Sequence, residues 1–421
     1  MTGKSSGGDE AGGGMGFSMG KRAGCFLNIV LLIASLCLVV FAVEVILRLV
    51  QPEAHELIAE NAIEPAHFLP DPGSSDQINV FDSRIGWRNN PGVSGQYSGP
   101  DGLLWKARIN SRGIRDAEIS AEPSPGVRRL ILLGDSFAWG YGLREEQRLS
   151  EILENIIPGL EVVNLGLVGT STDQQCLLLE EEGLGYRPDG VILLIHDTDI
   201  WHNSLSANYG RAKPHFVLGP AGLELRGVPV SLPPERTSAT VEIGEEGETK
   251  KAGPGLKRFF YENSRLYRLV SSRLKRVGFL RRVLQDAGLA QAGPDSEHNV
   301  ALTGAIVSRM RAASSAAGIN DFVVVLIPSK ELVCFHAGGY WIQAAELSRR
   351  ERESSRLAQV LRRDGVTTVE LAPEFIRRAR EGETLYFRED NHWNARANEL
   401  AAARLAALPE VSGEKTGEKK E

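Results

Sequence analysis

The sequence predicts an α/β protein with a three-layer α/β/α domain, about five parallel strands and an N-terminal transmembrane helix. After residue 127, short runs of β-branched residues alternate with amphipathic stretches, which is typical of a parallel sheet covered by helices. The 421 residues are 42% hydrophobic, which is enough for a sizeable core. A long apolar run near the N-terminus predicts the membrane helix.

The predicted strands follow one another along a main domain that we place at residues 127–408. They cover residues 129–133, 161–164, 191–195, 322–327 and 367–371. Helices are predicted at 146–156, 172–184 and 395–408. Ligands of such a sheet bind beyond the carboxyl ends of its strands, and the candidate catalytic residues fall at such ends.

Residues 21–50 are predicted to form a transmembrane signal anchor. Residues 25–43 are apolar apart from Asn28 and the small Ser35, a length that suits one bilayer crossing. A cleaved signal peptide has a shorter apolar region, and a buried core helix normally has a polar face. Lys21 and Arg22 precede the span and acidic residues follow it. The positive-inside rule then places the N-terminus in the cytoplasm and the main domain outside, in a periplasm or at the cell surface.

The remaining segments are predicted from their composition. Residues 1–20 are rich in Gly and Ser and read as a disordered cytoplasmic tail. Residues 51–126 are rich in turn residues and predict an irregular lead-in that packs on the main domain. Residues 203–298 are an insertion without an assigned role, whose basic stretch at 256–284 either lies on anionic lipid or is a solvated face. Residues 409–421 form a charged tail, which is predicted to fray from Gly413 onward.

The charge and the cysteines narrow the range of partners. A formal net charge of -6 gives no general attraction to phosphate backbones, so nucleic acid is not expected as a partner. Outside the apolar N-terminal segment the chain has only Cys176 and Cys334, which make no disulfide framework. No cofactor is expected.

A candidate nucleophile lies where the first predicted strand ends, in Gly134-Asp135-Ser136-Phe137. A serine between a strand and a helix has an exposed hydroxyl and backbone N–H groups nearby, the geometry that acyl transfer needs. Gly-Asp-Ser also serves as an ordinary turn and helix cap. The tetrapeptide alone therefore leaves both interpretations open.

A candidate base lies far downstream, in Asp390-Asn391-His392-Trp393. A serine hydroxyl needs a base to accept its proton, and the imidazole needs a carboxylate to fix its tautomer. His392 and Asp390 provide both groups, although a single histidine is as often a surface or capping residue. The pairing with Ser136 favours a catalytic function.

These motifs resemble those of the SGNH, or GDSL-type, hydrolases, which have a flavodoxin-like three-layer fold. The resemblance runs from about residue 128 to 408, with the insertion unmatched. The first block carries Phe137 where leucine is often found, and the second block, at 163–170, places the family's oxyanion-hole glycine on Gly169. The last block ends at Trp393, and many members have the acid three residues before the histidine, where Glu389 stands here.

The third block departs from the family pattern. Its members usually carry Gly-Asn-Asp after the third strand, whereas this chain reads Ile-His-Asp-Thr-Asp at 195–199, with Thr198 at the asparagine position. The resemblance therefore implies an oxyanion hole formed by the N–H groups of Ser136 and Gly169 with the Thr198 hydroxyl. Loss of a preorganised donor lowers the rate roughly a hundredfold or more, so a weak enzyme is also conceivable.

A second resemblance is to the alginate O-acetyltransferases, which modify exported polysaccharide. It rests on residues 326–330, 385–387 and 390–394, and the blocks occur in a different chain order. Those proteins use Asp-x-His with their serine, which supports Asp390 as the orienting acid. This resemblance implies acetyl transfer to a glycan.

Further polar residues near these motifs are candidates for the substrate pocket: Asp135, Asn164, His196, Asp197, Asp199, Lys330 and Trp393. We expect His196 and Asp197 at the rim and Asp199 as a support for the loop. Together with His202 these three could ligate a divalent metal, but one short loop rarely presents four side chains toward one point. No metal site is expected.

Aromatic residues near the motifs have two interpretations. Trp201, Trp393 and the pair at 340–341 could stack against sugar rings, or they could pack in the core or on the surface, which is the commoner fate of aromatic residues.

Two functional hypotheses follow. In the first, the chain is a membrane-anchored serine hydrolase or O-acyltransferase that acts on an acyl ester, in particular an acetyl ester, of an extracytoplasmic glycan or lipid. Ser136 attacks the carbonyl, His392 accepts the proton and Asp390 orients His392. In the second, the chain is an inactive SGNH-like module that binds envelope polysaccharide. The missing asparagine favours the second hypothesis.

Overall fold

The computed structural model describes residues 78–98, 104–209, 211–231, 296–338, 344–388 and 390–413, and a part of residues 31–45. The chain divides into two compact units, of which the first comprises residues 1–53 and 244–291. The second comprises residues 54–243 and 292–421 and holds nearly all the described residues.

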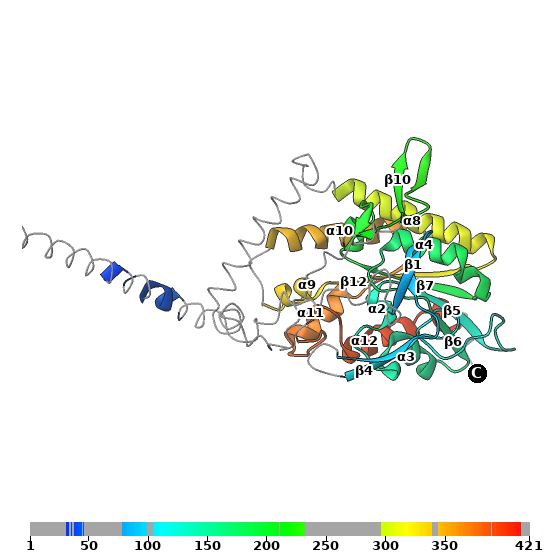
Figure 1. Cartoon of the computed structure of the whole chain (residues 1–421), viewed down its shortest axis with the longest axis horizontal. Helices are drawn as coiled ribbons and strands as arrows, with labels where there is room; N and C mark the ends of the chain where they lie inside the picture. Colours follow the sequence, from blue (N-terminus) through cyan, green and yellow to red (C-terminus); the bar gives the residue numbers. More distant parts are fainter. Residues whose placement is uncertain are drawn as a thin grey trace, which may run out of the picture. The chain divides into compact units, whose positions relative to one another are not determined.

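A five-stranded parallel sheet forms the centre of the second unit (Figure 1). Its strands in chain order are β5 (Arg128–Leu133), β6 (Leu160–Asn164), β7 (Gly190–His196), β12 (Asp321–Ile327) and β13 (Thr367–Glu370). In space they run β13-β12-β7-β5-β6. Numbered along the chain, the strands have the 2-1-3-4-5 order of flavodoxin-like folds. In this order the direction in which successive strands are added to the sheet reverses beside β5. The prediction of five parallel strands in an α/β fold is confirmed.

Alternate side chains of each strand enter two separate cores, because successive side chains of a strand point to opposite faces. Ile131 and Leu133 of β5 pack with one cluster, and Leu130 and Leu132 pack with the other. All four side chains are fully buried. Strands buried on both faces read as continuous apolar runs, which is why the sequence revealed them.

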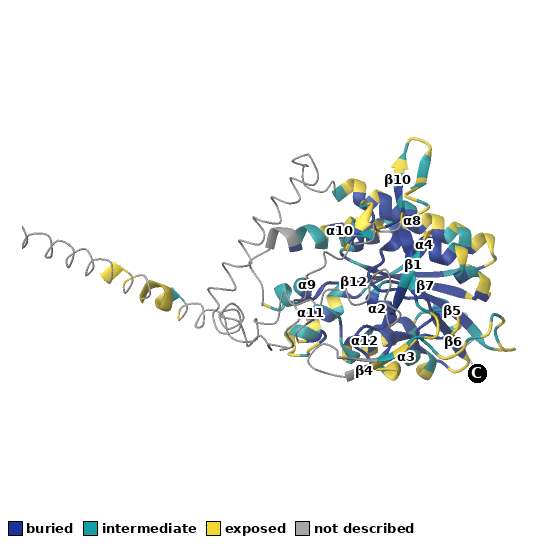
Figure 2. Ribbon diagram, viewed as in Figure 1, coloured by how far each residue is buried: buried dark blue, intermediate teal, exposed yellow. Residues whose placement is uncertain are grey.

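Helices cover both faces of the sheet, and Figure 2 shows the buried layer between them. The helices on the first face are α4 (Thr172–Glu181), α8 (Ser296–Ala316) and α10 (Ala344–Arg363). Those on the second face are α3 (Leu149–Ile156), α9 (Lys330–His336), α11 (Ala372–Arg380), α12 (Ala395–Ala406) and α13 (Pro409–Ser412). Short helices also occur in connections: α2 (Ser136–Trp139), η4 (Glu145–Gln147), η5 (Gly183–Tyr186) and α5 (Asp199–His202).

The lead-in is more regular than predicted. Its described residues form two antiparallel hairpins, one of β1 (Asn79–Asp82) with β2 (Gly86–Asn89), the other of β3 (Ser94–Ser98) with β4 (Leu104–Arg108). Trp105 of β4 packs edge-to-face on Trp139 at 5.6 Å between ring centroids, and the buried Trp87 donates a hydrogen bond to the Val168 carbonyl at 2.9 Å. The hairpins therefore pack on the loops that follow β5 and β6.

The insertion and the C-terminal tail also contain structure where the sequence predicted none. Residues 207–226 form two small hairpins, β8 (Ala207–Asn208) with β9 (Arg211–Ala212) and β10 (His215–Gly219) with β11 (Gly222–Arg226). Residues 232–295, including the basic stretch, lie outside the described residues. Val411 of α13 is fully buried, so the beginning of the predicted charged tail at 409–421 belongs to the core.

The predicted membrane anchor at 21–50 lies mostly outside the described residues, as does the predicted tail at 1–20. Within the part of the chain that the structure describes, no helix has both the length and the apolar composition needed to cross a bilayer.

Candidate active site

The nucleophile motif forms a sharp strand-to-helix turn. Gly134 follows β5 with a φ of +157°, and a Cβ on it would lie 2.8 Å from the Cβ of Ala138 and 3.0 Å from that of Leu194. Glycine is needed there because the chain passes so close to its neighbours. Asp135 caps α2 by accepting a hydrogen bond from the Phe137 N–H at 2.9 Å. Ser136 is thereby fixed at the first helical position.

Ser136, His392 and Asp390 lie together at the carboxyl end of the sheet. The Nε2 atom of His392 is 2.6 Å from the Ser136 hydroxyl oxygen, and its Nδ1 atom is 2.5 Å from Oδ1 of Asp390. The same Asp390 oxygen accepts the His392 backbone N–H at 2.7 Å. Ser136 is thus joined to His392, 256 positions later, and through it to Asp390, in the arrangement of a nucleophile, a base and an acid.

The negative charge of Asp390 and the positive charge of a protonated His392 stabilise each other. Burial acts to raise the pKa of Asp390, but attraction to His392 and hydrogen bonds from it outweigh burial and lower that pKa. Burial acts to lower the pKa of His392, but the Asp390 carboxylate outweighs it and raises that pKa above its ordinary value. An imidazolium beside Asp390 is therefore stabilised, as a general base requires after it accepts a proton.

Lys330 supports the loop that carries Asp390. Its ammonium donates hydrogen bonds to the carbonyl oxygens of Phe387, Arg388 and Asp390 at 2.7, 3.0 and 3.0 Å. Lys330 was predicted to line the pocket; only 3% of it is exposed, and its ammonium faces these carbonyl groups. Its amphipathic stem lets it reach from α9 to this loop.

Two aromatic rings from the nucleophile segment contact the His392 ring. The Tyr141 ring lies 4.5 Å from it between centroids, and the Phe137 ring lies 5.0 Å from it. Trp393 packs edge-on against Phe137 and is 1% exposed. For Trp393, this burial favours packing in the core, one of the two interpretations of the aromatic residues, over stacking on a sugar. The pair at 340–341 lies outside the described residues, as does Glu389.

The loop after β6 approaches the nucleophile turn closely. The Leu167 N–H donates to the Gly134 carbonyl at 3.0 Å, and a Cβ on Gly166 would lie 2.3 Å from the backbone nitrogen of Trp139. Asn164 is buried and donates to the Ala138 carbonyl at 2.8 Å. Asn164, which was predicted as a pocket residue, thus joins the two loops.

Two backbone N–H groups have the character of oxyanion donors. Within the described residues, neither the Ser136 nor the Gly169 N–H donates a hydrogen bond. Gly169 has a φ of +77°, and its carbonyl accepts a hydrogen bond from the buried Asn208 at 3.1 Å. Asn208 was not predicted, since nothing local in a short hairpin marks an amide that reaches another loop.

Thr198 faces His196. Its hydroxyl oxygen is 2.7 Å from Nδ1 of His196, and its backbone N–H also points at that nitrogen, at 3.4 Å. Since the N–H can only donate, Nδ1 acts as an acceptor, and the hydroxyl then donates to it as well. This contact engages the Thr198 hydroxyl with His196. The His196 ring stacks on Phe137 at 4.8 Å between centroids, which places it beside the nucleophile turn.

The acidic candidates are buried. Asp199 accepts the His196 backbone N–H at 3.2 Å, the supporting contact that we expected, and Asp197 accepts the Ser329 N–H at 3.2 Å. Asp197 is 3% exposed and so does not lie at the rim. Burial, with repulsion from Asp135, raises the pKa of Asp199 well above its ordinary value. Burial likewise raises the pKa of Asp135, against attraction from His196.

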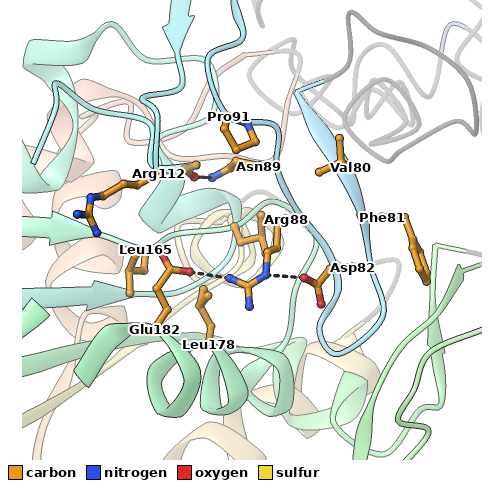
Figure 3. A pocket seen from close by; sticks show the side chains of 12 residues that line it. Val80, Phe81, Asp82, Arg88, Asn89, Pro91, Arg112, Leu165, Leu178 and Glu182 are labelled. Carbon is orange, nitrogen blue, oxygen red and sulfur yellow. Dashed lines mark hydrogen bonds and ion pairs between the residues drawn. The ribbon is translucent and has the colours of Figure 1, made fainter. Parts of the chain in front are cut away.

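A separate pocket of about 190 Å³ lies beneath the first hairpin (Figure 3). It is lined by β1, β2, α4 and the loops beside them, and no triad residue reaches it. The Arg88 guanidinium at its centre donates to Asp82 and Glu182, both at 2.6 Å. Both carboxylates neutralise the Arg88 charge, and these ion pairs connect the hairpin to the end of α4.

Comparison with known proteins shows a likeness to one family over part of the chain. Residues 285–420 match the model of the SGNH hydrolase-like domain of the acetyltransferase AlgX. The predicted resemblance to SGNH hydrolases is confirmed. The matched region contains Asp390 and His392 and supports acyl ester hydrolysis or transfer in general. A search of curated proteins found no significant match.

Solved structures with some likeness to the chain include esterases. One is an acetyl xylan esterase, AlAXEase, with a TM-score of 0.37 and 13% identity over 66% of this chain and 100% of that chain. Another is a G-D-S-L family lipolytic protein from Veillonella parvula, with a TM-score of 0.36 and 12% identity over 67% and 98%. A third is Est24, a carbohydrate acetylesterase from Sinorhizobium meliloti, with a TM-score of 0.34 and 13% identity over 67% and 99%.

Proposed function

We propose that this chain is a membrane-anchored SGNH-type serine enzyme that cleaves or transfers an acetyl ester on an extracytoplasmic glycan. The observation that carries the proposal is the contact of Ser136 with His392 at 2.6 Å, with Asp390 on the other ring nitrogen at 2.5 Å. The lowered pKa of Asp390, in which attraction from His392 outweighs burial, accords with an ionised orienting acid.

The reaction begins with attack of the Ser136 oxygen on the ester carbonyl. Nε2 of His392 accepts the hydroxyl proton while Nδ1–H remains bonded to Asp390. The N–H groups of Ser136 and Gly169 stabilise the oxyanion of the tetrahedral intermediate. The intermediate collapses when the bond to the alcohol oxygen breaks and His392 returns the proton to that oxygen.

The acyl-enzyme is then released by a second attack at the same carbonyl. Water or an acceptor hydroxyl gives its proton to His392, and its oxygen bonds to the acyl carbon. The proton returns to Ser136 as the ester bond to the enzyme breaks. Hydrolysis and transfer differ only in which oxygen nucleophile enters at this step.

A fluorophosphonate probe tests the proposed nucleophile. The unmutated chain should be labelled at Ser136, and Ser136→Ala should not. Ser204→Ala is a matched control because its hydroxyl, which donates to the Trp201 carbonyl, lies in an exposed contact. Absence of label on a folded, unmutated chain would reject the enzyme hypothesis. Acetate release from acetylated glycan, with and without a second glycan as acceptor, then distinguishes hydrolysis from transfer.

A second candidate function is a catalytically weak module that binds envelope polysaccharide. The observation that favours it is the Thr198 hydroxyl, which contacts His196 at 2.7 Å and so supplies no third oxyanion donor. Under this hypothesis Ser136 reacts with the probe, but the chain releases acetate from no acetylated glycan.

The membrane anchor and its orientation are part of the proposal. The apolar run at 25–43, with Lys21 and Arg22 before it, supports a cytoplasmic N-terminus and an extracytoplasmic domain. Alkaline phosphatase is active only outside the cytoplasm, so a fusion after residue 421 should be active and membrane-bound. An inactive fusion would reject this topology.

A further inference from the structure

Two aromatic side chains are exposed close to the candidate active site. Trp201 is 39% exposed and Tyr209 is 50% exposed, whereas most large apolar side chains of the described domain are buried. The His202 ring lies between them, 5.1 Å from the Trp201 ring and 6.5 Å from the Tyr209 ring between centroids. The planes of the Trp201 and His202 rings are inclined by 40°, and those of His202 and Tyr209 by 61°. We call this group of three rings the aromatic platform.

The platform is related to two parts of the candidate active site, the Gly169 loop and the turn that carries Asp135. The residue before Tyr209 is Asn208, whose amide donates to the Gly169 carbonyl at 3.1 Å. The Asp135 and Asp199 carboxylates act on the Tyr209 hydroxyl and, after burial, help to raise its pKa. The platform therefore adjoins the loop that carries Gly169 and is within electrostatic range of Asp135, which directly precedes Ser136.

The backbone holds Tyr209 in an unfavourable conformation. Its φ is +50°, in the left-handed region that residues with a side chain rarely adopt. The Asn208 side chain braces this turn by accepting the Tyr209 N–H at 3.1 Å. Tyr209 lies in the tight turn between β8 and β9, where a positive φ is the usual geometry, so the turn holds the ring in an exposed position.

We propose that the platform of Trp201, His202 and Tyr209 binds the pyranose ring that carries the acyl ester. This inference rests on the proposed function. Aromatic faces stack well on the C–H face of a pyranose, whose hydroxyl groups remain available for hydrogen bonds at the rim. His202 suits the middle of such a surface, since burial lowers its pKa to about 4 and leaves it neutral at neutral pH.

A sugar fits the platform better than a long acyl chain does. An acyl chain is bound best in a buried apolar channel, where all its methylene groups leave water. Trp201 and Tyr209 are instead half open to solvent and offer flat faces. The sugar therefore lies on the alcohol side of the ester, with the carbonyl directed at Ser136.

The test compares two substrates of the full-length chain. Acetylated xylo-oligosaccharide contains a pyranose, and p-nitrophenyl acetate does not. Trp201→Ala should raise KM for the oligosaccharide about tenfold more than KM for p-nitrophenyl acetate, a ratio that corresponds to about 1.4 kcal/mol of lost binding. Leu218→Ala is the control, because Leu218 is similarly exposed, at 37%, on a neighbouring hairpin and should leave both KM values unchanged.

Two further variants separate stacking from folding. Tyr209→Gly removes the ring but accepts a φ of +50° without strain, so it should fold and should also raise KM for the oligosaccharide. Tyr209→Phe keeps the ring and should retain the unmutated KM. Equal changes for both substrates, or no change in Trp201→Ala and Tyr209→Gly, would overturn the proposal.

Failure of this inference is distinguishable from failure of the proposed function. If Ser136 takes up no fluorophosphonate in the unmutated chain, the proposed function itself fails. If Ser136 is labelled and p-nitrophenyl acetate is hydrolysed, but Trp201→Ala selectively weakens turnover of p-nitrophenyl esters with long acyl chains, the platform binds an acyl chain and the sugar proposal is wrong.

Discussion

His392 is held on every side by a contact with a distinct consequence. Asp390 binds Nδ1, Ser136 binds Nε2, and the rings of Phe137 and Tyr141 lie against the imidazole at 5.0 and 4.5 Å. The hydrogen bonds fix the tautomer, and the rings restrict rotation of the imidazole. The base is thus oriented before substrate arrives, which is the condition under which general base catalysis is efficient.

Replacing Asp390 should change both the rate and its pH dependence. His392 acts as a base only when neutral, so kcat/KM should rise with pH through its pKa, which the Asp390 carboxylate raises above 6.5 despite burial. Asp390→Asn removes that attraction and leaves burial, so the rise should move to lower pH. The turnover should fall by about 10⁴-fold, the loss known for serine triads without their acid.

The measurement is a pH profile of p-nitrophenyl acetate hydrolysis between about pH 5 and about pH 9. Asp364→Asn serves as the control, because Asp364 is exposed at the end of α10 and pairs only with surface arginine. A pH profile of Asp390→Asn that coincides with that of the unmutated chain would show that Asp390 does not orient His392.

At the level of elements, the position of the nucleophile depends on how closely two loops approach. The turn between β5 and α2 and the loop after β6 are joined by the Leu167 to Gly134 hydrogen bond at 3.0 Å and by the amide of Asn164. The lead-in hairpins close over the same loops through Trp87 and Trp105. Ser136 is therefore positioned by three segments in addition to its own helix.

Gly166→Ala should disrupt this approach. Its Cβ would lie 2.3 Å from the Trp139 nitrogen, and backbone atoms cannot yield as a side chain can. We expect a loss of more than about 2 kcal/mol in the free energy of unfolding, because overpacking shifts the backbone. Urea denaturation measures this loss. Gly185→Ala has no atom within 4 Å of its Cβ and should change stability by less than about 0.5 kcal/mol. Equal stability of the two variants would contradict the packing argument.

Lys330→Met should separate loop support from pocket lining. It removes an ammonium that donates to three carbonyl groups of the 387–390 loop while keeping a stem of similar length. We expect a loss of about 2–3 kcal/mol in the free energy of unfolding, since hydrogen bonds from charged groups are strong. The turnover number should fall because Asp390 shifts, with KM little changed. Lys106→Met, at an exposed lysine, is the control. An unchanged turnover number would show that the loop holds its place without Lys330.

At the scale of the molecule, a buried polar network joins helices to the segment that carries the aromatic platform. Asp173 in the first turn of α4 pairs with Lys213, and both side chains are fully buried. Asn203 accepts the Asp173 N–H at 3.2 Å and donates to Thr303 of α8 at 3.0 Å. The segment between α5 and β10 is thus fixed to two core helices by polar contacts, with little apolar burial of its own.

Lys213→Met should destabilise the domain by about 3–5 kcal/mol, because it leaves Asp173 buried without its cation. Adding Asp173→Asn removes the unpaired charge and should recover a substantial part of that loss. Urea denaturation of the single and double variants measures both effects. Destabilisation of the single variant by less than about 1 kcal/mol would mean that Asp173 carries no charge in the folded domain.

The sequence predicted the features of the fold and the site that depend on neighbouring residues, namely the strands and the short motifs. The five strands were predicted because short runs of apolar and β-branched residues mark them, and Ser136, Asp390 and His392 were named because short motifs contain them. The burial of Lys330 and Trp393 was not predicted, since burial depends on distant segments. Asn208 was missed for the same reason, because its partner Gly169 is 39 positions away.

The contact between Ser136 and His392 also links activity to the completion of the chain. Ser136 belongs to the first strand-to-helix turn, and its base follows the last strand, 256 residues later. A growing chain that has emerged only as far as β12 contains the nucleophile but no base. Contacts of such large sequence separation form late, because their loop entropy is lost before they stabilise the fold. Under the proposed function, Ser136 therefore gains its base only when the final segment docks.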